Sequence, residues 1–311
     1  MNFSDSEIVS NVLEESVKSS SNAVDSISAA SYLSDVELVG LVFFLCFLGL
    51  IGFLENLLVI LSMVLGDGYL EVPANIFLLS LACADLLICG VSAPLLAYNC
   101  FHWIFTIFIS VSKFIVVATV GSIFLVTLNR LISIVRPLRC LHILTVQRAQ
   151  FMVAAIWAVA TLVIISAIIS FHSGMAWLAH ITKYFLAFYI LSTFAMYIYM
   201  YALSRRHRKL IRENTYAVTG RMKPAQREFR SLRTLVMVLG TCVACWLPMT
   251  IAFFFTNRWT APRQFYRAFT YTGPLVVVNA FIDPIIYYYR SRGFRLSLKI
   301  LSKRFEEYLY Q

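Results

Sequence analysis

Charged residues are scarce in this chain. Asp, Glu, Lys and Arg make up 14% of its 311 residues, apolar residues make up 60%, and the mean hydropathy is +0.77. A soluble domain does not carry so much apolar sequence in long runs. The chain also has no glycine-rich phosphate loop, no cysteines at metal-binding spacing, and no Ser-His-Asp or His-Glu-Xaa-Xaa-His arrangement at catalytic spacing. We therefore expect no enzymatic activity.

A cleavable signal peptide is also missing from the start of the chain. Residues 1–37 are rich in serine, carry seven acids and one lysine, and have no apolar core. We expect them to form a disordered extracellular tail. Asn2 opens a glycosylation sequon on that side of the membrane. Insertion into the membrane would then be directed by the first apolar stretch itself.

Seven apolar stretches make up most of the remaining sequence, and each is long enough to cross a membrane. They cover residues 38–65, 73–98, 103–135, 150–170, 180–204, 229–256 and 265–289. Backbone groups in lipid must bond to one another, so each stretch is expected to be a helix. The sequence therefore predicts an all-α membrane protein with a seven-transmembrane helix bundle over residues 38–290.

The last segment, residues 291–311, is predicted to contain a short amphipathic helix. Phe294, Leu298, Leu301 and Phe305 recur at helical spacing, with basic residues between them. A helix of this kind lies in the membrane interface and does not cross the bilayer. We expect this segment to be cytoplasmic.

Basic residues indicate which ends of the helices face the cytoplasm. Of the 26 Lys and Arg residues, 20 follow the third, fifth and seventh stretches, counting Arg130. Loops rich in Lys and Arg stay cytoplasmic, so we expect the N-terminus outside and the C-terminus inside the plasma membrane. The net charge of +10 then reflects this orientation and the anionic membrane lipids of the inner leaflet. Because the bases flank the spans, no nucleic-acid partner is expected.

Polar residues inside the stretches are expected to meet at one depth. They are Asn56, Asp85, Thr119, Asn279 and Asp283. Two carboxylates at one dry site cannot both stay ionised without a counter-charge. A proton or a cation such as Na⁺ at Asp85 would resolve the conflict, and no other cofactor is expected. The alternative is a hydrogen-bonded core that only fixes helix packing.

Arg130 lies at the cytoplasmic end of the third stretch, where its guanidinium needs acceptors or water. Glu228 lies about five turns before Trp246 on one stripe of the sixth stretch, which would bring its carboxylate near Arg130 as a breakable ion pair. The alternative is an Arg130 side chain that only extends to the lipid headgroups. Pro248 should kink the sixth stretch and make it a hinge, unless it is an ordinary membrane-helix proline.

These residues together resemble the motifs of rhodopsin-like (class A) G-protein-coupled receptors. The motifs, in order, are Glu55-Asn56, Leu81-Ala82-Cys83-Ala84-Asp85, Asn129-Arg130-Leu131, Trp157, Cys245-Trp246-Leu247-Pro248, and Asn279 with Asp283-Pro284-Ile285-Ile286-Tyr287. The resemblance covers residues 38–305 and is greatest to the group of melanocortin, cannabinoid, adenosine and lysophospholipid receptors. It implies that Arg130 engages a G-protein α-subunit. It also implies a switch that includes Asn129, Glu228, Pro248 and Tyr287.

The chain departs from this family pattern at several positions. Asn129 replaces the acid that usually precedes the arginine, and the cysteine that usually opens the third span is absent. Melanocortin receptors place acids in the outer second and third spans, where they bind Ca²⁺ and a basic peptide. The corresponding regions here hold Pro94, Leu95, Phe105 and Ile109. A ligand of the melanocortin type is therefore not expected.

The outer third of the bundle is predicted to hold an aromatic and mostly uncharged pocket. Its candidate lining residues are Lys113, Phe188, Trp246, Phe253 and Tyr271. Lys113 is the one charged candidate, so a lipid or amphiphile with an anionic head would suit this pocket. The alternative is that the aromatic side chains face lipid and that Lys113 extends outward.

The expected function is that of a receptor. An outer ligand shifts an existing equilibrium between inactive and active helix packings, and a heterotrimeric G protein binds the active one. Because Asn129 supplies no charge, some activity is expected without ligand. An ion or proton transporter that uses Asp85 and Asp283 as a relay is the rival reading. Transporters usually show internal repeats, and this sequence shows none.

Overall fold

The computed structural model describes most of the bundle. It covers residues 33–66, 68–99, 105–136, 139–173, 176–218, 240–242, 244–252, 254–255 and 262–290, and the separate positions 295, 298, 300, 302 and 303. Every regular element in these ranges is helical, which confirms the predicted all-α membrane fold. The N-terminal tail up to residue 32, Glu228 and Phe253 lie outside the described residues.

Six of the described helices are long and apolar enough to cross a membrane. In chain order they are α2 (Asp35–Val64), the continuous pair α3 (Pro73–Leu87) and α4 (Ala93–Asn99), α5 (Phe105–Val135), α7 (Val146–Ser173), α8 (Ala176–Val218) and α10 (Pro262–Arg290). A short helix, α6 (Cys140–Ile143), lies between α5 and α7. The sixth predicted span is described as a shorter apolar helix over Gly240–Ala252.

The first helix begins at a capping box. Ser34 Oγ accepts a hydrogen bond from the Glu37 backbone N–H over 3.4 Å, and Glu37 Oε2 accepts one from the Ser34 backbone N–H over 2.9 Å. Two of the backbone donors at the start of α2 are thereby satisfied. The helix therefore begins at Asp35, three residues before the first predicted span.

A π-helical segment, Ile88–Ser92, joins α3 to α4. The Ala93 N–H donates to the Ile88 carbonyl, five residues back in place of four. Pro94 explains the widened turn, because a proline ring clashes with the carbonyl four residues before it in a regular α-helix. The second span thus continues past Pro94 without breaking.

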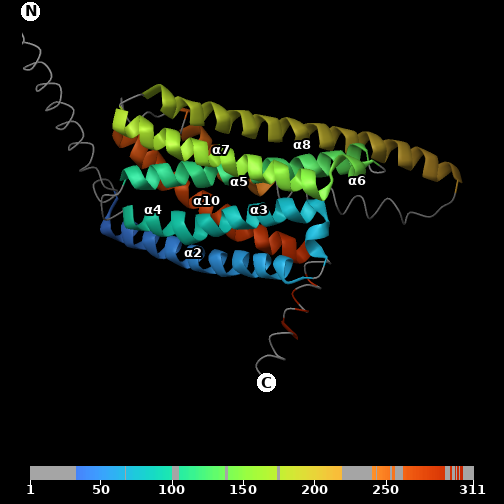
Figure 1. Cartoon of the computed structure of the whole chain (residues 1–311), viewed down its shortest axis with the longest axis horizontal. Coiled ribbons are helices and arrows are strands. Elements are labelled where there is room, and N and C mark those ends of the chain that lie inside the picture. Colours follow the sequence, from blue (N-terminus) through green and yellow to red (C-terminus); the bar gives the residue numbers. More distant parts are fainter. Residues whose placement is uncertain are drawn as a thin grey trace, which may run out of the picture.

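α5 occupies the middle of the bundle, and α2 and α8 lie on opposite sides of it (Figure 1). α5 packs against α3, α7 and α8, and α10 packs against α2. Helix packing is tight where α2 meets the π-helical segment. A Cβ added to Gly52 would lie 2.7 Å from the Cys89 Sγ atom, so a larger residue here would force one of the two groups to shift.

α8 is longer than its sequence pattern predicted. The predicted span ended at residue 204, whereas the helix continues to Val218 and extends beyond the end of α7 (Figure 1). Hydropathy marks where a helix leaves the membrane and not where the helix ends. Residues such as Arg and Lys, which follow Leu203, have high helix propensity in water.

Candidate functional site

The five polar residues predicted to share one depth are all buried. They lie on four elements: Asn56 on α2, Asp85 on α3, Thr119 on α5, and Asn279 and Asp283 on α10. Asp85 has no exposed surface at all, and Asp283 is 3% exposed. Placing two carboxyl groups in such a site is costly unless they are paired or neutralised.

The asparagines use their amide groups differently. Asn56 Nδ2 donates to the Gly52 carbonyl and to the Ala280 carbonyl, both over 2.9 Å, and so ties α2 to α10. Asn279 Nδ2 donates to Asp283 Oδ2 over 3.2 Å. Thr119 donates to the Ile115 carbonyl within its own helix, over 2.9 Å. The donor of Thr119 is therefore directed away from the carboxyl groups.

Asp85 is left without a donor from the rest of the cluster. Neither of its carboxyl oxygens has a hydrogen-bond partner among the described residues. The Asp85 carboxyl group lies close enough to that of Asp283 for their charges to interact. Two ionised carboxylates at one dry site repel each other, and a proton on one of them would remove the repulsion. A cation between them would meet the same electrostatic need.

Glu55 is a third acid at this depth that the sequence reasoning did not assign to the cluster. It precedes Asn56 on α2, and its Oε2 atom is buried without a hydrogen-bond partner. An acid in the middle of an apolar span is itself a signal, because such residues are expensive in lipid.

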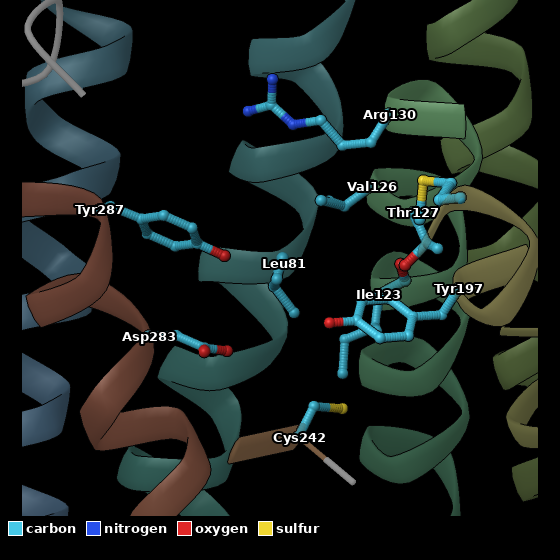
Figure 2. A pocket seen from close by; sticks show the side chains of 10 residues that line it. Leu81, Ile123, Val126, Thr127, Arg130, Tyr197, Cys242, Asp283 and Tyr287 are labelled. Carbon is cyan, nitrogen blue, oxygen red and sulfur yellow. The ribbon is translucent and has the colours of Figure 1, made fainter. Parts of the chain in front are cut away.

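A cavity of about 40 Å³ lies between the polar cluster and Arg130. Figure 2 shows its lining: Leu81, Ile123, Val126, Thr127, Arg130, Tyr197, Met200, Cys242, Asp283 and Tyr287. The hydroxyl groups of Tyr197 and Tyr287 are buried without partners among the described residues. A cavity of this size has room for water, and such hydroxyls are the partners that a buried water needs.

Arg130 and Asn129 differ in exposure although they are neighbours. Asn129 is buried, whereas Arg130 is exposed, and its guanidinium lies above Tyr287 and Asp283 in Figure 2. Within the described ranges, Arg130 has no hydrogen bond or ion pair. The predicted pairing with Glu228 involves a residue outside those ranges and stays a prediction.

Trp246 is buried in the main core cluster, together with Met249, Phe269 and Val277. Its indole N–H has no hydrogen-bond partner among the described residues. Thr250 Oγ1 donates to the Trp246 carbonyl over 2.8 Å. Pro248, which has no N–H to donate, follows on the same helix at partial burial.

The residues predicted to line an outer pocket differ in exposure. Lys113 is partly buried on α5, and Trp246 is buried. Phe188 is 64% exposed on α8, and Tyr271 is 52% exposed on α10. The place of these two side chains in an outer pocket stays a prediction. An aromatic residue in a span gives no sign of its direction by itself.

Comparisons with known proteins agree with the motif order. The model of the 7 transmembrane receptor (rhodopsin family) matches residues 55–287. Human melanocortin receptor 5 is 30% identical to this chain over 271 residues, 81% of each protein. Mouse melanocortin receptor 3 is 28% identical over 273 residues, which cover 81% of this chain and 82% of that receptor.

Proposed function

The chain belongs to the rhodopsin family of seven-transmembrane receptors, and we propose that it acts in the plasma membrane with its N-terminus outside. It is a multi-pass membrane protein and a G-protein-coupled receptor, which passes the signal of an extracellular ligand to heterotrimeric G proteins. The proposed orientation is supported by the basic residues, which gather at the end of the bundle where Arg130 lies.

The observation that carries the proposed mechanism is the order of sites along the bundle. Trp246 lies in the core, the Asp85–Asp283 pair follows, and the cavity leads from Asp283 to Arg130. Outer ligand binding would shift the packing around Trp246, and the cavity allows the helices around it to repack. Arg130 would then bind the G-protein α-subunit. A ligand acts in this way only through unequal affinity for the two packings.

The rival function, an ion or proton transporter, is not supported by the family match. Asp85 and Asp283, the buried acids that suggested a transporter, lie in a chain of the receptor family. Their role in the proposal is to link α3 to α10 through a shared proton or Na⁺, with Asp85 as the residue that holds it. Members of this family act as receptors, and the chain offers no motif for bond-making chemistry.

The proposed ligand is a lipid or amphiphile with an anionic head. From Ile88 to Ile282 the chain contains only two acids, Glu213 and Glu228, and both lie at the Arg130 end. The outer halves of the second to seventh spans therefore offer no carboxylate to a basic ligand. Lys113 on α5 and Lys183 on α8 supply positive charge there. This chemistry favours an anion, although the relatives are named as melanocortin receptors.

The test is G-protein activation in cells that express the chain, measured as separation of labelled Gα and Gβγ for each Gα class. We expect activation above that of empty cells when anionic lipids are added, and loss of it in Arg130→Ala at equal surface expression. An N-terminal epitope should be accessible in intact cells. Ion currents without any G-protein response would contradict the receptor mechanism. Activation by melanocortin peptides and not by lipids would contradict the ligand class.

A further inference from the structure

α8 extends far beyond the membrane. Its 43 residues span about 65 Å, whereas the hydrocarbon core is about 30 Å thick. The apolar part ends at Leu203, and the fifteen residues that follow remain helical up to Val218. Five of these residues are basic: Arg205, Arg206, Arg208, Lys209 and Arg212. A basic cluster directly after a membrane span is typical of a site for anionic lipid.

Helix register decides on which side of α8 these bases lie. Residues seven apart are almost two full turns apart and so share a face. Leu191 and Ile198 are exposed on the membrane-facing side of α8, and the same row continues to Arg205 and Arg212. The adjacent row of exposed residues, Phe194 and Tyr201, continues to Arg208. Three arginines therefore fall on the continuation of the lipid-facing surface, and a fourth, Arg206, continues the row of the exposed Tyr199.

The opposite face of the extension has no lysine or arginine in its central row. Thr193 and Met200 are buried against the bundle, and their row continues to His207 and Asn214. A G protein bound at Arg130 would approach this inner side, since α8 packs against α5. The asymmetry separates the arginines from the side of the helix that the proposed G-protein site would use.

The contact between Arg205 and Tyr201 indicates how deep Arg205 lies in the membrane. Its side chain is exposed, and its guanidinium carbon lies 5.9 Å from the centre of the Tyr201 ring, within the range of a cation–π contact. Tyr201 is among the last residues of the apolar part of α8. Arg205 therefore lies one turn from the hydrocarbon, at the level where lipid headgroups carry their phosphates.

We propose that Arg205, Arg208 and Arg212, here called the arginine stripe, bind the phosphorylated headgroup of an anionic lipid in the inner leaflet beside α8. Guanidinium groups match phosphate oxygens in a bidentate way, which an ammonium group cannot do. Glu213 is the one acid in the extension and lies four residues after Lys209, a spacing at which the two pair on a helix. The stripe itself has no acid at such a spacing. This lipid site is separate from signalling to G proteins. It depends on the proposed function in one respect: the proposed orientation places the arginines at the inner leaflet.

The test uses the full chain in phosphatidylcholine nanodiscs, titrated with short-chain phosphatidylinositol bisphosphate at fixed salt. The triple variant R205Q/R208Q/R212Q should bind about a hundredfold more weakly, on the basis of about fivefold per base. The matched control, R221Q/K223Q/R227Q, removes the same charge from a segment outside the described residues and should change affinity by less than about threefold. R205K/R208K/R212K should give an intermediate loss, because it keeps the charge and removes the bidentate geometry.

Equal losses in the stripe variant and its control would overturn the site and indicate a diffuse charge effect. Free inositol trisphosphate that binds as tightly as the lipid would overturn the membrane-lipid assignment. Glutamine is a good helix former, so thermal unfolding in plain phosphatidylcholine should be the same for all variants. The binding measurement needs neither a receptor ligand nor a G protein. Its failure would therefore leave the proposed function standing, and failure of G-protein activation would leave the lipid site standing.

Discussion

Asn279 lies one turn before Asp283 on α10 and donates its Nδ2 hydrogen to Asp283 Oδ2 over 3.2 Å. This bond gives Asp283 a donor that Asp85 lacks. Asp85 is fully buried, and the nearby amide of Asn56 is used by two backbone carbonyls. The two acids thus face the same dry site with unequal support. The proton or cation that the pair requires is expected to be held mainly by Asp85.

The first prediction concerns that proton or cation. If Na⁺ occupies the site in the inactive packing, NaCl should raise the unfolding temperature of the unliganded receptor more than choline chloride does. Asp85→Asn should remove the difference, because an amide supplies no charge to hold the ion. Thermal unfolding of purified receptor in both salts measures this. Identical curves in the wild type would rule out Na⁺ and leave a shared proton as the only form of the proposal.

A second prediction concerns the close contact between α2 and the π-helical segment. Gly52→Ala should lower the unfolding temperature, because the new Cβ would lie 2.7 Å from the Cys89 Sγ and one of them must move. Overpacking of this kind costs about 1–3 kcal/mol. Gly40→Ala is the matched control on the same helix, since a Cβ there meets no atom within 4 Å.

The double variant Gly52→Ala/Cys89→Ala identifies the cause. Removing the sulfur should restore most of the lost stability, as expected for two residues in contact. If the double variant is no more stable than Gly52→Ala, the contact with Cys89 is not what makes glycine necessary at this position.

The sequence was sufficient to predict the six spanning helices that the structure describes and the burial of the five polar residues. Apolar length fixes a membrane helix because lipid leaves the backbone no other partner, and isolated polar residues such as Asp85 stand out in such spans. The sequence did not show that Asn56 binds backbone carbonyls in place of a carboxylate. Donor directions depend on the distance and rotation between helices, which periodicity does not contain.

The outer pocket was harder to predict than the cluster for a physical reason. Both faces of a membrane helix are apolar, so hydropathy does not separate the lipid-facing side from the bundle-facing side. Phe188 and Tyr271 were assigned inward on residue type and are exposed in the structure. The end of α8 was missed because a helix that leaves the membrane continues wherever its residues favour helix.

The third prediction concerns the proposed anionic ligand. Lys113→Ala should weaken binding by about 1.5–3 kcal/mol, the contribution of a hydrogen bond to a charged group. Phe253→Ala should also weaken it through lost apolar burial. Phe188→Ala should weaken it less, because 64% of that side chain is exposed. Competition binding with an activating lipid measures all three. Unchanged affinity in the first two variants would place the ligand elsewhere.

The last prediction concerns activity without ligand. Asn129 accepts hydrogen bonds but supplies no charge, and Arg130 is exposed with no partner among the described residues. The proposed pair with Glu228 would be at most partly buried, and an exposed ion pair contributes only about 0–1 kcal/mol. A restraint this weak leaves a measurable fraction of unliganded receptor in the active packing. Asn129→Asp should lower ligand-free G-protein activation at equal surface expression, because it places a carboxylate beside the guanidinium. Glu228→Ala should raise it. If ligand-free signalling equals that of empty cells and neither variant changes it, Arg130 is restrained by a contact other than these two.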